Sequence, residues 1–237
     1  MTPLYEGKSK RLWPTENPFT LRMEFKNDAT AFNGQKKVSF ENKGRFNNAI
    51  STLIYGLLEQ QGVPTHFVRQ IDDTNVEVKK VEILMVEVIV RNVSAGSYCK
   101  RTGIEEGRPF SQPVVEFSYK SDELGDPLIN DDYIREMGLA TTEDLSHLRL
   151  SALKVNAILT EFFAKCGLKL VDFKLEFGRL AEDPSRIVLA DEISPDGCRL
   201  WDLTTGEKMD KDRFRRDLGN VMEAYEEVLG RVKSHLV

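Results

Sequence analysis

The stretch LVDFKLEFG, residues 170–178, alternates between apolar and charged side chains. Successive side chains of an extended chain point to opposite faces, so this pattern predicts a strand. One face would be formed by the apolar side chains of Val171, Phe173, Leu175 and Phe177. The other would carry the charged side chains of Asp172, Lys174 and Glu176. Such a strand is either a half-solvated member of an antiparallel sheet, with its charges paired to neighbours, or one wall of a binding site.

The composition is that of an ordinary globular protein. The chain has 237 residues, a length sufficient for one large domain or two small lobes. Hydrophobic residues make up 41% of it and charged residues 30%. A net charge of −5 argues against a nucleic-acid binder that relies on bulk positive charge. The N-terminal MTPLYEGKSK lacks the apolar core of a signal peptide, and no apolar run reaches membrane-spanning length. We therefore expect a cytoplasmic protein that contacts neither membrane nor nucleic acid.

Cysteine and histidine give no metal-site pattern. The three cysteines include no CxxC pair, which suits free thiols in a reducing compartment. The three histidines are scattered, so a histidine-based metal site or a Ser/His/Asp triad is not expected. Any metal would have to be held by oxygen ligands.

Strand-like and helix-like segments are mixed irregularly, which favours an α+β fold. Strands are expected in LYEGKSKRLW and TLRMEFKND, which flank the loop PTENP, and again in THFVRQI and TNVEVKKVEILMVEVIVRN. Helical spacing runs from Phe46 to Leu58 and ends at Gly62, and a longer helix is expected from about Thr142 to Cys166. Residues 98–130 are rich in turns and give no assignment.

The C-terminal part is expected to contain two strands, a loop and a helix. The strands are LKLVDFKLEFG and RIVLADE, and the loop is SPDGCRLWDLTTGEKMD. The last amphipathic helix would carry the apolar side chains of Phe214, Leu218, Val221, Tyr225, Val228 and Val232.

Two short motifs are candidates for anion binding. GKSK, residues 7–10, would place Lys8 and Lys10 on one strand face beside a glycine, but it is not a P-loop, and solvated surface lysines would look the same. RNVSAGS, residues 91–97, places Arg91 at a strand end and Ser97 after a glycine. Guanidinium, hydroxyl and backbone N–H groups could there surround one anion, although Arg91 in a surface ion pair is an equal alternative.

The carboxylates are the stronger candidate for a site. If LVDFKLEFG and RIVLADE form a hairpin, either Asp191 or Glu192 meets the charged face, depending on a register that the sequence leaves open. Clustered carboxylates repel unless a cation neutralises them, and Mg²⁺ is commonly held by one or two carboxylates plus substrate phosphates. Lys174 could balance these acids or face a developing negative charge. The turn PDGCR then presents Asp196 and Arg199.

Together these motifs resemble a known family. VRNVSAGS, LVDFKLEFG, DEISPDGCRLWD and MDKDRFRRDLG are similar to those of phosphoribosylaminoimidazole-succinocarboxamide synthases, also called SAICAR synthetases. The resemblance is collinear from LYEGKSK to the final helix, so it covers nearly the whole chain. One departure is Met85, which lies two residues before Glu87 where family members usually have proline.

The resemblance implies a fold and a reaction. The fold would be related to ATP-grasp ligases, with a smaller N-terminal β-rich lobe, residues 1–83, covering the nucleotide, and a larger α+β lobe, residues 84–237. The enzyme would join L-aspartate to the carboxylate of carboxyaminoimidazole ribonucleotide in de novo purine biosynthesis, using ATP and Mg²⁺ and releasing ADP and phosphate. A carboxylate is a poor acyl donor, so ATP would first phosphorylate it. The resemblance also implies a homodimer.

The resemblance assigns roles to individual positions. Those that would contact ATP are Lys8, Lys10, Val81, Ile83, Lys120 and Glu176. Those that would hold the ribonucleotide phosphate are Arg91, Ser97 and Arg199, with Arg215 nearby. Asp191 and Asp126 would bind Mg²⁺. Lys174 and Asp196 would act at the reacting centre, with Asp196 contacting the aminoimidazole.

Two other functions fit the same residues. A kinase-like phosphotransferase would yield a phosphorylated product without consuming aspartate. A non-catalytic nucleotide-binding regulator would bind ATP and release no ADP in response to aspartate.

Overall fold

The computed structural model describes residues 2–31 and 36–236 and has two larger antiparallel sheets. The first follows the order β1-β2-β3-β7-β6. Its strands are β1 (Tyr5–Glu6), β2 (Lys10–Pro14), β3 (Thr20–Phe25), β7 (Asn75–Lys79) and β6 (Phe67–Gln70). The hairpin predicted around PTENP is therefore confirmed as β2 and β3, with Leu12 opposite Met23. A separate ribbon pairs β4 (Asp28–Ala31) with β5 (Lys36–Ser39).

The second sheet is built around β12 (Leu168–Leu180), the strand that contains LVDFKLEFG. The path of this sheet is β11-β10-β9-β12-β13, and β8 and β14 also pair with β12. The remaining bounds are β8 (Val81–Ile83), β9 (Val86–Val93), β10 (Pro109–Tyr119), β11 (Leu128–Ile129), β13 (Ile187–Ala190) and β14 (Cys198–Asp202). Thus β12 lies at the centre of this sheet, with neighbours on both sides.

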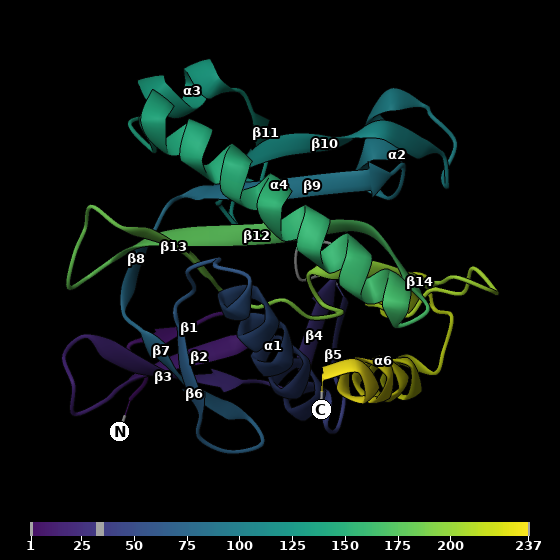
Figure 1. Ribbon diagram of the computed structural model, residues 1–237, viewed down its shortest axis with the longest axis horizontal. Helices are drawn as coiled ribbons and strands as arrows, with labels where there is room; N and C mark the ends of the chain where they lie inside the picture. The colour runs from purple at the N-terminus through teal and green to yellow at the C-terminus, as the bar shows by residue number, and fades with distance from the viewer. Residues whose placement is uncertain (1, 32–35, 237) are drawn as a thin grey trace.

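Three long helices pack around these sheets. They are α1 (Lys43–Gln60), α4 (Thr142–Lys165) and α6 (Val221–Leu236). Figure 1 shows α4 crossing one face of the second sheet, while α1 and α6 lie side by side below it. The short helices are α2 (Ser97–Thr102), α3 (Asp131–Glu136) and α5 (Asp212–Arg215). The two helices predicted in the first two-thirds of the chain are confirmed as α1 and α4.

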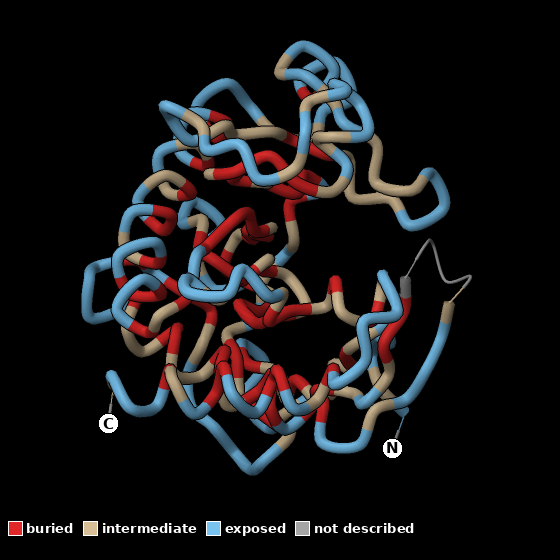
Figure 2. The backbone as a smooth tube through the Cα atoms, turned by 90° about the vertical axis from the view of Figure 1, so that its right-hand side faces the viewer, coloured by how far each residue is buried: buried red, intermediate tan, exposed pale blue. Residues whose placement is uncertain are grey.

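One main hydrophobic core joins the three long helices to the second sheet. Figure 2 shows buried backbone concentrated in the interior, with exposed segments around it. A smaller cluster inside the first sheet consists of Met23, Phe25, Val76 and Val78. Because α1 contributes Ile50, Ile54 and Leu58 to the main core, it ties the N-terminal part of the chain to the rest.

A bulge near the start of β12 changes the predicted alternation. The pairing of β12 with β14 shifts register between Leu170 and Asp172. Beyond the bulge the apolar side chains enter the main core as predicted. Val171 packs instead in a separate cluster with Val93, Ala95 and Trp201. The prediction that Val171 shares a face with Phe173 is therefore wrong, because one extra residue reverses the side-chain direction.

Two other predictions need correction, and the region left unassigned contains a strand. CRLWD, predicted as loop, is strand β14 and pairs with β12. The unassigned region contains the long strand β10. The single C-terminal helix is two helices, α5 and α6, separated by a turn in which Asp217, Gly219 and Asn220 have positive φ. Leu218 lies in this turn and is 48% exposed rather than on a buried helix face.

Candidate active site

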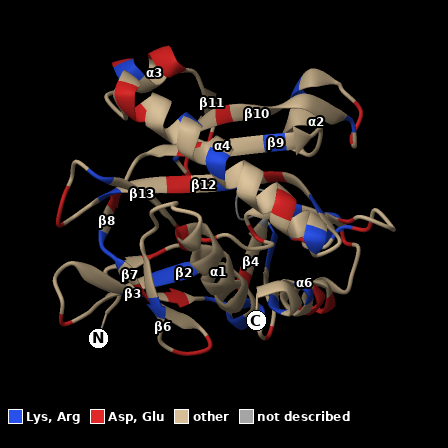
Figure 3. Ribbon diagram, viewed as in Figure 1, with Lys and Arg blue, Asp and Glu red and all other residues tan. Residues whose placement is uncertain are grey.

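A cavity of about 670 Å³ is lined by the first hairpin, β12, the segment after β13 and α5. Most residues predicted for the site line this cavity, namely Lys8, Lys10, Val81, Ile83, Lys120, Asp126, Lys174, Glu176, Asp191, Asp196 and Arg215. Apolar side chains also line it, namely Leu12, Leu21, Met23, Val78 and Met85. Figure 3 shows basic positions on β2 and acidic positions on β12, two strands that contribute to the lining. The cavity therefore combines charged groups with apolar surface.

Lys10 is the buried cation of the first hairpin. Its ammonium pairs with the carboxylate of Asp191 and lies 2.8 Å from that of Glu192. Burial alone would lower the pKa of Lys10, but the two carboxylates outweigh it, so its pKa lies above the ordinary value. Lys8 is far more exposed and pairs with Asp122 at 2.6 Å. The two lysines of GKSK thus have different environments, although both line the cavity.

The predicted hairpin pairs β12 with β13 and ends with Ala190 opposite Glu176, so neither Asp191 nor Glu192 is part of the ladder. Asp191 follows with a φ of +66°, a left-handed backbone conformation that is uncommon for residues other than glycine. The hydroxyl of Tyr55 donates to the Ala190 carbonyl at 3.0 Å and helps to hold this strand end. Burial raises the pKa of Asp191, but Lys10 and Lys174 overcome that effect and hold it well below its usual range. Asp191 is therefore a buried, ionised carboxylate.

The charged side of β12 is divided between two groups of contacts. Lys174 lies 2.7 Å from Glu87 and 2.6 Å from Glu176, and Lys120 lies 2.8 Å from Glu176. Asp172 pairs instead with arginines. The charges of this strand are thus paired with neighbours, as one interpretation of the sequence expected, and Lys174 and Glu176 also line the cavity.

The remaining predicted residues form an arginine cluster. Arg91 donates to Asp172 at 2.6 Å and to Ser97 at 3.1 Å. Arg199 donates to the same Asp172 at 2.9 Å and to Asp212 at 3.0 Å. The described residues that line the cavity do not include Arg91, Ser97 or Arg199.

Asp212 connects this cluster to the cavity. Its carboxylate also accepts from Arg215, a cavity-lining residue, at 2.6 Å. A Cβ at Gly96 would collide with the guanidinium of Arg199, so this position has no room for a larger side chain. Burial would lower the pKa of Arg199, but Asp172 and Asp212 raise it above its ordinary value. The predictions did not include Asp212, although DRFRR in the MDKDRFRRDLG motif was a signal for it.

Asp196 lies in a second buried network that sequence reasoning missed. It lies in the turn before β14, and its Oδ1 accepts from the Tyr225 hydroxyl at 2.7 Å. Its Oδ2 lies 2.6 Å from Nζ of Lys43, a side chain only 1% exposed. Lys211 lies 3.8 Å from the same oxygen. Nothing in the local sequence of Lys43 or Tyr225 reveals that α1 and α6 converge on this turn.

The two predicted metal ligands both line the cavity. Asp126 has a φ of +50°, and its Oδ1 accepts from the Ser121 N–H at 2.9 Å. In the described parts of the chain, His, Cys, Asp and Glu side chains form no ready-made group of three or more around a metal position. Met85, the departure from the family pattern, is 42% exposed, and its carbonyl accepts from the Lys120 N–H at 3.1 Å.

A cavity that combines paired lysines and carboxylates, apolar surface and nearby arginines defines a class of protein that binds anionic, nucleotide-like small molecules. The chain belongs to the SAICAR synthetase family, whose model matches residues 3–232. This confirms the family resemblance of the sequence motifs and the α+β fold expected from it.

Individual relatives agree with this assignment. The phosphoribosylaminoimidazole-succinocarboxamide synthase of Akkermansia muciniphila is 66% identical over 234 residues, covering 99% of both chains. The crystal structure of the synthase from Ehrlichia chaffeensis has a TM-score of 0.96 at 44% identity and covers 98% of each chain. A SAICAR synthetase in complex with ADP has a TM-score of 0.93 at 45% identity, again covering 98% of each chain.

In the described residues, no helix is both long and apolar enough to cross a membrane.

Proposed function

We propose that this protein is an ATP-dependent ligase that joins L-aspartate to the carboxylate of carboxyaminoimidazole ribonucleotide in de novo purine biosynthesis. The products are SAICAR, ADP and phosphate. The observation that carries the proposal is that the Lys10–Asp191 pair, Asp196 and Arg215 all line one cavity. A ligase of this kind must hold a triphosphate and two anionic substrates together, which requires several cations in one place.

The ATP half of the site is assigned to the first hairpin and the residues facing it. Lys8 and Lys10 contact the phosphates, while Lys120 and Glu176 lie near the nucleotide. Val81 and Ile83 line the adenine pocket, which agrees with their position on the cavity wall beside other apolar side chains. Residues 1–83 then form the lobe that covers the nucleotide. The related synthetase that was solved with ADP supports nucleotide binding in this fold.

Mg²⁺ is assigned to Asp191 and Asp126. The donor set fits this ion, because Asp191 is an ionised carboxylate whose negative charge is at present balanced by Lys10 and Lys174. Mg²⁺ commonly combines one or two carboxylates with substrate phosphates, so two aspartates suffice on the protein side. When bound, the ion neutralises phosphate charge during transfer.

The ribonucleotide is assigned to the arginine cluster. Arg91, Ser97 and Arg199 hold its phosphate, with Arg215 nearby. Asp172 and Asp212 support this assignment because they fix two guanidinium groups each at distances of 2.6–3.0 Å. The rest of the ribonucleotide would then extend past Arg215 into the cavity.

Lys174 and Asp196 are assigned to the reacting centre. Lys174 faces negative charge that develops on the transferring phosphoryl group, and Asp196 contacts the aminoimidazole ring. Transfer of the γ-phosphoryl group to the substrate carboxylate gives an acyl phosphate. The aspartate amine then attacks its carbonyl carbon and expels phosphate, so the protein acts mainly by positioning and charge stabilisation.

Labelled oxygen tests the acyl phosphate directly. Ribonucleotide carrying heavy oxygen in the reacting carboxylate should deliver one labelled oxygen to inorganic phosphate in each turnover. A kinase would retain the label in a phosphorylated product, and a binding protein would release no phosphate. Unlabelled phosphate accompanying normal amide formation would rule out the acyl phosphate while leaving the ligase assignment intact. ADP release measured with each substrate omitted in turn tests the ligase assignment itself.

Two further features of the proposal rest on the sequence, the location on the expectation that it has no signal peptide and the dimer on the family resemblance. We assign the enzyme to the cytoplasm, and we expect it to function as a homodimer. Light scattering coupled to size-exclusion chromatography measures the mass in solution, and a mass equal to one chain would contradict the dimer.

A further inference from the structure

Lys211 is a cavity residue that the assignments above do not use. It precedes α5, and its side chain is 15% exposed. Its backbone N–H donates to the Pro195 carbonyl at 3.0 Å, and its carbonyl accepts from the Arg215 N–H at 3.0 Å. The main chain therefore ties Lys211 to the turn that carries Asp196 and places it one helical turn before Arg215.

The ammonium of Lys211 has only a loose carboxylate contact among the described residues. Asp196 Oδ2 lies 3.8 Å away, too far for a hydrogen bond. The ammonium of Lys43 lies closer to the same oxygen, at 2.6 Å but without hydrogen-bond geometry, and the other carboxylate oxygen accepts from the Tyr225 hydroxyl at 2.7 Å. Asp196 thus gives Lys211 less stabilisation than a dedicated ion-pair partner would.

The charges around Lys211 come from several elements. Asp196 and Glu192 from the segment after β13 favour its charged form, whereas Arg215 from α5 and Lys43 from α1 oppose it. Tyr225 from α6 is neutral, and its hydroxyl donates a hydrogen bond to Asp196. Burial is the largest influence and, together with the two cations, lowers the pKa of Lys211 below its ordinary value.

Other lysines in the same cavity show the opposite behaviour. The pKa values of Lys10, Lys120 and Lys174 lie above the ordinary value, because neighbouring carboxylates outweigh burial. These three are suited to remain charged against phosphates. Within one site, environments that push pKa values apart mark the separate roles of acid, base and fixed charge.

The position of Lys211 agrees with a role at the point of bond formation. Lys10 is assigned to the ATP phosphates and Asp191 to Mg²⁺, and Arg215 is placed near the ribonucleotide phosphate. Within the segment 191–197 the cavity is lined by Asp191, Glu192, Asp196 and Gly197. The backbone N–H of Lys211 donates to the Pro195 carbonyl in the same segment. The carboxylate to be activated must lie between the two substrates, and the attacking amine must reach it there.

We propose that Lys211 is the catalytic base that removes a proton from the ammonium group of L-aspartate. This inference rests on the proposed ligase function. The neutral Lys211 amine accepts one proton from the aspartate ammonium, which becomes a neutral amine. The nitrogen lone pair forms the C–N bond, and the C–O bond to phosphate breaks with its electron pair leaving on phosphate. The departing phosphate takes up the second proton that the nitrogen loses as the amide forms. A buried lysine can serve in this way because its neutral form is more accessible than that of an exposed lysine.

The test compares Lys211→Arg with the unaltered enzyme. Arginine keeps the positive charge and can still bind an anion, but it cannot become neutral. We expect aspartate-dependent turnover to fall about a hundredfold to ten-thousandfold, mainly in kcat. Hydroxylamine is uncharged at neutral pH and can trap an acyl phosphate as a hydroxamate without a base. ADP release with ribonucleotide and hydroxylamine should therefore stay within a few-fold of the unaltered enzyme.

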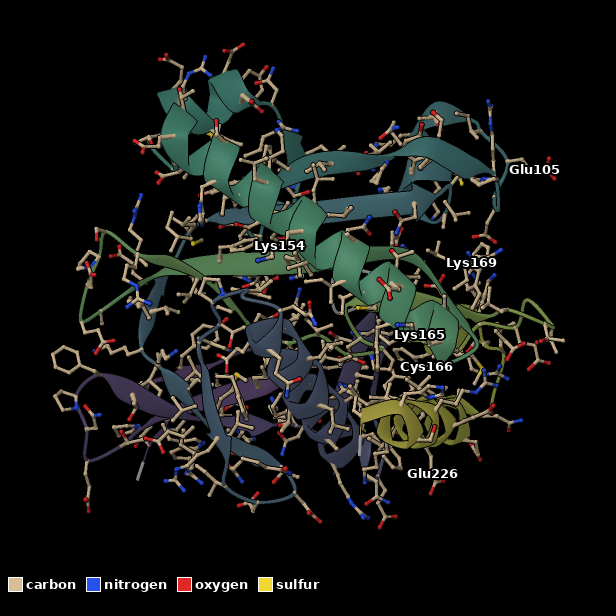
Figure 4. The ribbon with its side chains drawn as sticks, in the orientation of Figure 1. Glu105, Lys154, Lys165, Cys166, Lys169 and Glu226 are labelled. Atoms are coloured by element: carbon tan, nitrogen blue, oxygen red, sulfur yellow. The ribbon has the colours of Figure 1, made fainter. Side chains whose placement is uncertain are left out.

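A pH profile provides a second readout. The residual aspartate-dependent rate of Lys211→Arg should rise about tenfold per pH unit on the alkaline side, because solvent must then deprotonate the amine. Lys165→Arg is the matched control, since Lys165 lies at the exposed end of α4 and pairs with Glu161 (Figure 4). It should retain full turnover and the unaltered pH profile.

The outcomes separate this inference from the function on which it rests. Unchanged aspartate turnover in Lys211→Arg, or equal losses with aspartate and hydroxylamine, would overturn the role of base. If the unaltered enzyme forms amide but no hydroxamate, the acyl-phosphate mechanism is contradicted. The pH profiles alone then decide whether Lys211 is the base. An unaltered enzyme that forms no amide at all would refute the ligase function and the role of Lys211 with it.

Discussion

Asp191 is the residue whose substitution most directly tests the metal assignment. Asp191→Asn removes the negative charge while keeping the size of the side chain, and Glu192 remains to pair with Lys10. We expect turnover to fall about a hundredfold or more, because a weakened Mg²⁺ site misplaces the phosphates. Initial rates over a series of Mg²⁺ concentrations measure the effect.

The control for this substitution is Asp183→Asn, in the connection between β12 and β13. Asp183 accepts hydrogen bonds from Ser185, and asparagine retains an acceptor oxygen there. Its turnover should equal that of the unaltered enzyme. Near-normal activity of Asp191→Asn at ordinary Mg²⁺ concentrations would contradict the metal role.

Arg199→Ala tests the ribonucleotide half of the site. A charge-assisted hydrogen bond is worth roughly 1.5–3 kcal/mol, so ribonucleotide affinity should fall about ten- to a hundredfold, with ATP affinity little changed. Asp172 keeps Arg91 and Asp212 keeps Arg215, so neither carboxylate is left buried without a partner. Calorimetric titration with each ligand separately measures both affinities. Arg186→Ala, at an exposed position, should change neither, and loss of ATP affinity alone in Arg199→Ala would reverse the assignment.

At the residue scale, the sequence predicted side chains whose motifs carry charge beside glycine or in strict alternation. Lys10 and Glu176 were found in this way, whereas Asp191 was found from its position at the end of a predicted strand. All three line the cavity. Lys43 and Tyr225 were not found, because each looks like an ordinary helix residue in its own segment. Their importance comes from a contact with Asp196 that only the tertiary structure creates.

At the element scale, α4 was predictable because local chemistry determines both of its ends. Thr141 and Asp144 form a capping box, in which each side chain accepts a hydrogen bond from the backbone N–H of the other. The break between α5 and α6 was not predictable from apolar periodicity, which continues through Leu218. The β12 bulge was likewise invisible, because alternation along one strand does not report the register of its partner.

The same capping box gives a prediction about stability. Thr141→Ala should lower the free energy of unfolding by about 1 kcal/mol, because the Asp144 N–H loses its acceptor. Thr141→Ser keeps the hydroxyl and should remain within a few tenths of a kcal/mol of the unaltered protein. Urea unfolding of the three proteins under one buffer condition measures the difference. Equal stabilities for the alanine and serine variants would show that the cap contributes nothing.

At the scale of the whole molecule, the site depends on contacts between segments far apart in the chain. Lys10 of the first hairpin contacts Asp191, which follows β13. Lys43 of α1 contacts Asp196 in the turn before β14. The class of fold could be predicted from the mixture of elements. The convergence of these segments could be predicted only through the family resemblance, since spacing along a chain does not give distances between its distant parts.

Two buried groups give stability opposite dependences on pH. Burial lowers the pKa of His66 to about 4 from 6.5, so its contribution is complete above pH 6.5 and is lost as the pH falls toward 4. Burial and the neighbouring Asp212 raise the pKa of Asp210 to about 7 from 3.8. Its contribution is complete below pH 3.8 and is lost as the pH rises through 7. Between pH 4 and 6.5 the two effects oppose each other, so the unaltered protein should show little net change.

His66→Gln separates the two effects, because glutamine stays neutral in both the folded and the unfolded chain. One pH unit of differential protonation corresponds to about 1.4 kcal/mol, so at pH 5 the histidine costs the unaltered protein about 2 kcal/mol relative to pH 7. The variant avoids this cost, and its stability relative to the unaltered protein should therefore improve by about 2 kcal/mol between pH 7 and pH 5. Urea unfolding of both proteins at the two pH values measures this difference, and any constant effect of the substitution on packing cancels. A stability difference that is the same at both pH values would mean that His66 takes up its proton as readily in the folded protein as in the unfolded chain.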